Sequence, residues 1–256
     1  MLRIIALTLA VVLPVAVQAA DLTRWQNISQ VLFPGVTIAE DSNTITLVTA
    51  NRAEDAAIVP VDIHTRFPQT TQYYVTDIWL VIDQNPSPVA AHFMFTPQSA
   101  QADIETRVRI NEYTLIRAIA RTSDGRYHQD MKFIKASGGC SAPATKDAEV
   151  QGLGRIKISR LDSLLGRPGL LQTQIRHPND SGLAFDQISR NYIPAHYVRH
   201  MKVSHDDQVI MTADLDISIS ENPEFRFYVD SAFVGNVVVT FTDDTEQVWS
   251  ARSPNP

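Results

Sequence analysis

Apolar and polar residues alternate with a period of two along most of this chain, which is the pattern of half-buried β-strands. An early segment differs, because Trp25, Ile28 and Leu32 recur at the spacing of one face of a helix. Thr23 and Gln26 fit a capping box at its start, and a Pro-Gly pair follows it. The pattern therefore predicts one short helix before a long series of strands.

The strands fall into two sets of about seven, with turns every eight to twelve residues. The first set is expected at 44–48, 58–63, 73–82, 89–95, 106–110, 113–121 and 126–136, and the second at 155–159, 170–176, 197–203, 209–215, 225–230, 236–242 and 247–251. Between the sets, Ser137 to Leu153 is small, polar and without periodicity, which is typical of a linker.

We therefore predict an all-β chain of two immunoglobulin-like antiparallel β-sandwich domains with a short N-terminal helix. Neither domain can contain an inter-sheet disulfide, because the chain has one cysteine, so each core is expected to hold by packing alone. The expected segments are a signal peptide at 1–19, a first domain at 20–136, a linker at 137–153 and a second domain at 154–256.

The first residues resemble a secretory signal. Met1-Leu2-Arg3 is a short basic start, Ile4 to Val17 is almost wholly apolar, and Val17-Gln18-Ala19 ends in small residues. We predict cleavage after Ala19 and export to the periplasm; an uncleaved N-terminal anchor is the alternative. No later stretch is long and apolar enough to cross a bilayer, so no membrane association is expected after cleavage.

Charge and motif content exclude several functions. The chain has 22 Lys and Arg against 28 Asp and Glu, a net charge of −6, and its basic residues form no long run. Nucleic-acid binding is therefore not expected, because it needs dense positive charge. No serine-hydrolase elbow, phosphate loop or dinucleotide fingerprint occurs, carboxylates are scattered, and Asp243-Asp244 is interpreted as a turn. We expect no cofactor.

Among the 7 histidines, His196, His200 and His205 are closest in sequence. On a helix the first two would share a face and could bind zinc. They lie in a strand-like segment, however, where positions four apart are separated by ~13 Å. We therefore expect no metal site and interpret the histidines as solvated or core residues.

The chemical signal is Cys140, the only cysteine. It lies near the start of the linker and has small neighbours on both sides, which predicts an exposed thiol on a flexible arm. The expected arm residues beside it are Ser137, Gly138, Gly139, Ser141 and Ala142. A slim, mobile thiol suits covalent carrying, whereas a catalytic thiolate needs rigid placement beside a base. An incidental linker thiol is the alternative interpretation.

These residues resemble the SoxYZ sulfur-compound carriers of periplasmic sulfur oxidation. In the first half, Ala53 to Val61 resembles an early strand motif of SoxY, and Ser137-Gly138-Gly139-Cys140 resembles its Gly-Gly-Cys-Gly-Gly carrier arm. The second half resembles SoxZ in several stretches. These are Gly154 to Ile158, His177-Pro178 with Gly182, Ile219 to Pro223, and Phe241 to Asp244.

The resemblance implies that Cys140 is the attachment point for sulfur intermediates and that the protein is not an enzyme. It implies as partners the enzymes and cytochromes c of a periplasmic sulfur-oxidation or quinoprotein dehydrogenase system, because the joined halves are similar to fused carriers associated with quinoprotein dehydrogenases. The halves are expected to pair within the chain or by exchange in a dimer.

Two features depart from the family pattern. The family arm is a free C-terminus, whereas Cys140 is tethered on both sides, and Ser141-Ala142-Pro143 replaces the two glycines after the cysteine. A thiol-independent periplasmic binding module or chaperone is a rival function. An enzyme with Cys140 as nucleophile and a histidine as base is a third.

Overall fold

The computed structural model describes residues 15–144, 152–161, 168–206, 208–230, 233 and 235–253. They form two units, a short N-terminal unit that ends at Gly35 and a main unit that begins at Val36. The N-terminal unit contains helix α1 (Val15–Leu32), and Gly35 follows it with a left-handed backbone (φ 71°) that favours glycine.

The first half of the main unit, residues 36–144, contains eight of the described strands and two short 3₁₀ helices, η1 (Pro97–Ser99) and η2 (Gly139–Ser141). The strands are β1 (Ile38–Glu40), β2 (Ile45–Val48), β3 (Val59–Thr65), β4 (Val75–Ile82), β5 (Val89–Phe95), β6 (Ile104–Val108), β7 (Thr114–Thr122) and β8 (Tyr127–Ile134).

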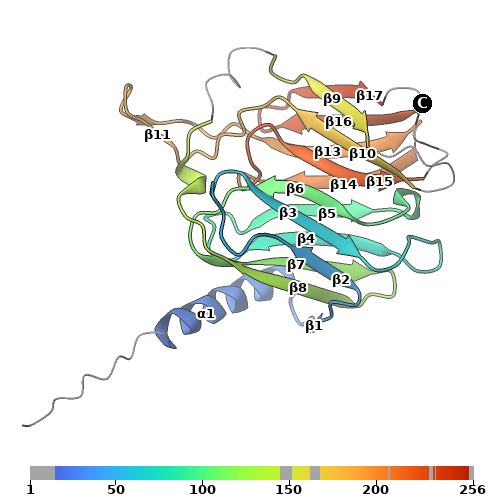
Figure 1. The fold of residues 1–256 in the computed structure, drawn as a ribbon, viewed down its shortest axis with the longest axis horizontal. Coiled ribbons are helices and arrows are strands. Elements are labelled where there is room, and N and C mark those ends of the chain that lie inside the picture. Colours follow the sequence, from blue (N-terminus) through green and yellow to red (C-terminus); the bar gives the residue numbers. More distant parts are fainter. Residues whose placement is uncertain are drawn as a thin grey trace, which may run out of the picture. The chain divides into compact units, whose positions relative to one another are not determined.

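The second half, residues 152–253, contains the remaining described strands. They are β9 (Ile156–Arg160), β10 (Gly169–Ile175), β11 (Phe185–Asp186), β12 (Asn191–Tyr192), β13 (Val198–His205), β14 (Gln208–Leu215), β15 (Glu224–Val229), β16 (Val237–Asp243) and β17 (Val248–Arg252). The hairpin of β11 and β12 stands apart from the main sheets (Figure 1).

The two halves share both of the large sheets. One sheet has the order β1-β8-β7-β4-β5-β14-β13-β16-β17, and the other has the order β2-β3-β6-β15-β10-β9. The halves meet where β5 pairs antiparallel with β14, from Phe95 opposite Met211 to Ala91 opposite Leu215. In the second sheet they meet where β6 pairs with β15, so each sheet runs across the whole main unit (Figure 1).

The hydrophobic core is continuous across the halves as well. Phe93 on β5 makes an edge-to-face contact with Phe225 on β15, with ring centroids 6.2 Å apart. Phe225 then stacks on Phe241 of β16 at 6.3 Å. These three rings come from both sheets and both halves, and each is fully buried. The halves therefore pair within one chain and share one apolar cluster.

The all-β class, with sandwich halves and a helix near the N-terminus, is confirmed. The predicted helix start at Thr23 is wrong, because α1 already begins at Val15 and Thr23 lies inside it. The predicted strands correspond to named strands, whereas the short β1, β11 and β12 were not anticipated, and β1 pairs parallel with β8. Residues 1–14 of the predicted signal peptide and 145–151 of the predicted linker lie outside the described residues.

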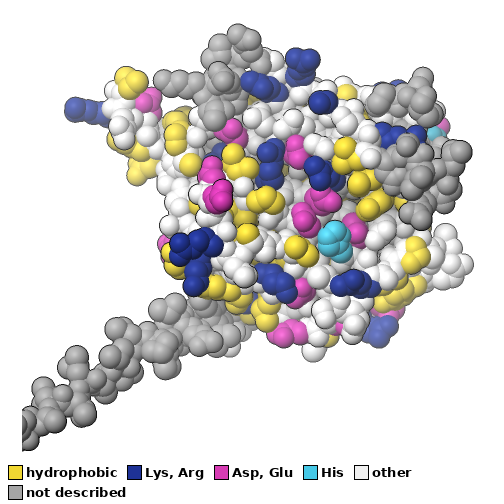
Figure 2. All heavy atoms as spheres, in the orientation of Figure 1, with side chains coloured by type: hydrophobic (Ala, Val, Ile, Leu, Met, Phe, Trp, Pro, Cys, Tyr) yellow, Lys and Arg dark blue, Asp and Glu magenta, His cyan; other side chains and the backbone are white. Residues whose placement is uncertain are grey.

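The face of the molecule shown in Figure 2 agrees with the charge balance of the sequence. On the face shown in Figure 2, acidic and basic side chains are interspersed, without a continuous basic patch. Among the described residues, no helix combines the length and apolar character needed to cross a membrane.

Candidate functional site around Cys140

The cysteine segment, residues 138–142, forms a tight turn built by two glycines. Gly138 precedes η2 with a left-handed backbone (φ 83°), which glycine adopts without strain. Gly139 is buried, and a Cβ placed there would collide with the backbone oxygen of Ala56. The Gly-Gly pair therefore permits a sharp turn and close packing.

Backbone hydrogen bonds fix this turn to the loop after β6. The N–H of Gly138 donates to the oxygen of Asn111 at 2.9 Å, and the N–H of Gly139 donates to the oxygen of Ile110 at 2.8 Å. Ile110 in turn donates its own N–H to Ala56 at 2.8 Å. The start of the segment is consequently held by the first half itself.

Cys140 lies at the centre of the turn and is fully buried, with 0% exposure. Burial raises the pKa of its thiol to about 11, and the positive charge of Arg109 acts in the opposite direction. At neutral pH the sulfur is thus a protonated thiol. Since the thiolate is the nucleophile, Cys140 is unreactive in this position.

The prediction of an exposed thiol is therefore wrong for this structure. Gly139 is buried with Cys140, and Ala142 is partly buried, whereas Ser137, Gly138 and Ser141 are exposed. Small residues were expected to leave the thiol accessible. Instead, their small size lets the backbone approach neighbouring carbonyl groups closely enough to enclose it.

Arg109, which directly follows β6, holds the cysteine segment from below the surface. Arg109 is only 1% exposed. Nη1 donates to the backbone oxygens of Gly139 and Ala142, both at 3.2 Å, and Nη2 donates to the oxygen of Asn179 at 3.3 Å. One buried guanidinium thus joins both sides of Cys140 to the second half of the chain.

Burial lowers the pKa of Arg109, and surrounding negative groups, Glu221 foremost, raise it. An arginine pKa is so high that the group stays charged. The three backbone oxygens accept charge-assisted hydrogen bonds, which are stronger than neutral ones. Nε of Arg109, in contrast, has no hydrogen-bond partner among the described residues.

The second half contacts the cysteine segment through the 177–182 turn, which follows β10. The hydroxyl of Ser181 donates a short hydrogen bond to the backbone oxygen of Cys140. Asn179 has a left-handed backbone (φ 49°) and is fully buried. Its side chain accepts from the N–H of Val198 at 2.9 Å and donates to the oxygen of Ile219 at 2.9 Å.

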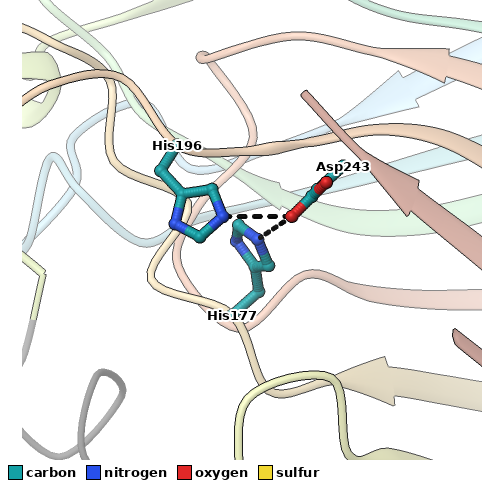
Figure 3. A group of neighbouring side chains, drawn as sticks. All are labelled: His177, His196 and Asp243. Carbon is teal, nitrogen blue, oxygen red and sulfur yellow. Dashed lines mark hydrogen bonds and ion pairs between the residues drawn. The ribbon is translucent and has the colours of Figure 1, made fainter. Parts of the chain in front are cut away.

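Three side chains behind this turn converge, as Figure 3 shows: His177, His196 and Asp243. Nε2 of His196 lies 3.0 Å from Oδ2 of Asp243, and Nε2 of His177 lies 3.7 Å from the same oxygen. The ring centroids of the two histidines are 4.5 Å apart. The residue types and distances suit a metal ion, so the protonation of the rings decides what the cluster can do.

The hydrogen bonds of His177 decide against metal binding through Nε2. The N–H of Asn179 donates to Nδ1 of His177 at 3.0 Å, so Nδ1 carries a lone pair rather than a proton. Burial lowers the pKa of His177 to about 4, so the ring is neutral and its proton lies on Nε2. A protonated Nε2 points toward Asp243 and has no lone pair for a metal ion.

Asp243 has a structural role in the turn between β16 and β17. Its Oδ1 accepts hydrogen bonds from the N–H groups of Thr245 and Gln247, both at 2.9 Å. Burial opposes its ionisation, but these hydrogen bonds and that of His196 lower the pKa of Asp243 below its usual value. The predicted turn at this position is confirmed. The carboxylate also pairs with His196, whose backbone is bonded to Asp180 of the 177–182 turn.

The chain matches two known protein families. Residues 29–140 match the family model of the sulfur oxidation protein SoxY, and residues 159–254 match that of the sulphur oxidation protein SoxZ. This chain belongs to the SoxYZ family, with SoxY and SoxZ domains joined in one chain. Membership supports a role as a carrier in sulfur oxidation. The SoxY match ends at Cys140 itself.

Similar solved structures cover the chain only in part. The sulfur carrier protein SoxY from Chlorobium limicola f thiosulfatophilum is 21% identical, covers 46% of this chain and 96% of its own, and superposes with a TM-score of 0.39. A superoxide reductase (neelaredoxin) from Ignicoccus hospitalis is 13% identical over 36% of this chain and 79% of its own, with a TM-score of 0.32. No curated protein matches.

The SoxZ half also forms an open apolar groove beside the cysteine segment. A cavity of about 890 Å³ is lined by Ser141 and Pro143 on one side and by the β11–β12 hairpin on the other. The hairpin and its tip expose large apolar side chains. Ile188 is 88% exposed and Tyr192 is 66% exposed. Solvent-exposed apolar groups of this size are typical of interaction surfaces.

The three histidines considered as a metal group lie with different partners. His196 belongs to the cluster with His177 and Asp243, His200 is bonded to Asp214 at 2.9 Å, and His205 stacks on Phe233. Sequence reasoning missed Arg109, Ser181 and the His177 cluster. The motif stretches that resemble SoxZ, His177-Pro178 and Phe241 to Asp244, contained the only signal for that cluster.

Proposed function

We propose that this SoxYZ fusion is a periplasmic carrier that holds a sulfur-containing intermediate covalently on Cys140 and presents it to partner enzymes. The main support is position: the only cysteine of the chain is the last residue of the SoxY match and lies in a glycine turn beside an open groove. Arg109 and Ser181 hydrogen-bond to the segment that carries Cys140, and neither side chain is a general base of the kind a catalytic thiol uses, which favours carrying over catalysis.

Loading has a defined chemical balance. When the Cys140 thiol joins a thiolate sulfur of the cargo in an S–S bond, the thiol loses its proton and the two sulfur atoms together lose two electrons. The proposed partners include cytochromes c, which accept electrons, and a quinoprotein dehydrogenase system is the proposed setting of the fused form. A signal peptide cleaved after Ala19 would bring the protein to that compartment.

The test uses the fact that the chain has a single cysteine. Intact protein isolated from the native host is expected to show a substoichiometric mass adduct that disappears on treatment with a reductant. Because no second cysteine exists, a reductant-labile adduct identifies Cys140. Cys140→Ser should abolish sulfur oxidation in the host while the purified variant stays folded, and Ser141→Ala, at an exposed neighbour, should retain it.

The buried thiol and the open groove favour one rival, a thiol-independent binding module. Such a module would act through the β11–β12 hairpin and would not need the sulfur atom. A host strain with Cys140→Ser that oxidises sulfur compounds at the wild-type rate would support this rival and contradict the carrier proposal. Loss of oxidation with Cys140→Ser, together with the labile adduct, would exclude it.

A further inference from the structure

The observed position of Cys140 conflicts with its proposed use, because a buried thiol can neither be loaded nor presented. Either the segment leaves this position during the carrier cycle or the thiol is never used. The contacts that hold the segment therefore bear directly on its function. They come from two separate parts of the chain, the loop after β6 and the 177–182 turn.

Arg109 is the central contact. It donates to the oxygens on both sides of Cys140 and, with its other terminal nitrogen, to Asn179 of the SoxZ half. If the cysteine segment departed, Nη1 would lose both of its acceptors. Because hydrogen bonds from a charged guanidinium are stronger than neutral ones, Arg109 favours the docked position.

The SoxZ half supplies the second contact, from Ser181 to the oxygen of Cys140. The turn that carries Ser181 is itself fixed. His177 accepts the N–H of Asn179, and the backbones of Asp180 and His196 exchange two hydrogen bonds of 2.8 and 3.1 Å. The His177, His196 and Asp243 cluster therefore holds in place the backbone oxygen of Asn179 and the hydroxyl of Ser181.

We infer that Arg109 and the 177–182 turn of the SoxZ half form a latch that holds the cysteine segment docked and protects Cys140 until the segment is released. This inference rests on the proposed carrier function and assigns a specific task to the SoxZ half. The docked form is the protected state, and a released form is the one that is loaded. Arg109 and Ser181 are positioning residues that set the balance between the two forms.

The latch is tested by the rate at which iodoacetamide alkylates Cys140 in the folded, full-length protein. Wild-type protein should react at least a hundredfold more slowly than the same protein in denaturant. Ser181→Ala, which removes one hydrogen bond, should raise the folded-state rate roughly fivefold. Arg109→Gln removes charge-assisted bonds and should raise it roughly ten- to hundredfold.

Arg107→Gln is the matched control. Arg107 lies two positions earlier, on β6, and its Nη2 also reaches the SoxZ half, where it donates to the oxygen of Asn222 at 3.1 Å. It makes no described contact with the cysteine segment. The alkylation rate of Arg107→Gln should therefore match that of the wild-type protein, and circular dichroism should show that each variant is folded.

Three results would overturn the latch. These are a wild-type rate equal to that in denaturant, a Ser181→Ala rate equal to that of wild type, and an increase in Arg107→Gln as large as that in Arg109→Gln. The second result remains decisive if Arg109→Gln fails to fold. The alkylation rates test the latch and do not depend on cargo, whereas the mass adduct tests the carrier proposal. The latch can therefore fail while a labile adduct still supports the carrier. Conversely, the carrier proposal can fail while the order of the alkylation rates is unchanged.

Discussion

Protonation of His177 is expected to make the stability of the protein depend on pH, and His177→Asn should remove that contribution. The His177 side chain is fully buried, and its Nδ1 accepts a hydrogen bond from the N–H of Asn179 at 3.0 Å. The oxygen of an asparagine side chain can accept a hydrogen bond at the same position without titrating near neutral pH. The variant thus keeps the acceptor and removes the ionisable ring.

The sign and size follow from the pKa of the folded state. Burial, with a smaller effect of the charge on His196, lowers the pKa of His177 from 6.5 to about 4. Between these values the unfolded chain binds a proton that the folded protein does not, so the free energy of unfolding falls as pH decreases. The loss is about 2 kcal/mol at pH 5 and about 3 kcal/mol at pH 4, relative to pH 8.

Urea unfolding of both proteins at pH 8 and pH 5 measures this effect. The variant has its own loss of packing at pH 8, so the test compares the change with pH within each protein. Other titrating groups contribute equally to both, and the wild-type protein should lose about 2 kcal/mol more than His177→Asn. Equal losses in the two proteins would show that His177 is not buried as a neutral ring, and the tautomer argument against metal binding would fall with it.

Three further predictions concern packing and the thiol. Gly139→Ala should raise the alkylation rate of Cys140 because its Cβ collides with the backbone oxygen of Ala56. Gly125→Ala is the control: Gly125 has a left-handed backbone (φ 83°) and open space around it, so the variant should lose about 1 kcal/mol of stability in urea unfolding and leave the alkylation rate unchanged. Asp83→Asn should destabilise by roughly 3–5 kcal/mol, because it removes the negative charge that faces the buried Arg117 at 2.9 Å; urea unfolding measures the loss, and a loss below 1 kcal/mol would contradict this. With a thiol pKa of about 11, the alkylation rate of Cys140 should keep rising above pH 9, where an exposed thiol would level off.

The strands were predictable because their signal is local. Val59, Val61 and Ile63 on β3 are all buried and alternate with more exposed neighbours, which is the period-two pattern read from the sequence. The sharing of sheets was not predictable in the same way. Pairing of Phe95 with Met211 depends on the edges of two distant strands, and no spacing along the chain encodes which edges meet.

The site was predictable only in its central residue. Cys140 could be singled out as the sole thiol, but its burial depends on Arg109 and Ser181, which lie 31 and 41 positions away. Glycine-rich composition predicts conformational freedom, and in this fold it serves close packing instead. His177 and Asp243 likewise converge only because β10 and β16 end at the same region of the sandwich.

A latched cysteine places a requirement on its partners. Release breaks the two hydrogen bonds from Arg109, the one from Ser181 and the backbone bonds of Gly138 and Gly139. At about 1 kcal/mol net for each bond, and more for those to the charged guanidinium, docking is favoured by several kcal/mol, offset in part by the chain entropy that release restores. A partner enzyme can shift this balance only by binding the released form more tightly than the docked form.

We therefore expect a loading enzyme to bind Arg109→Gln more tightly than it binds the wild-type protein, as measured by calorimetry. Its affinity for Arg107→Gln should equal its affinity for the wild-type protein. Weaker binding of Arg109→Gln would mean that the partner recognises the docked form.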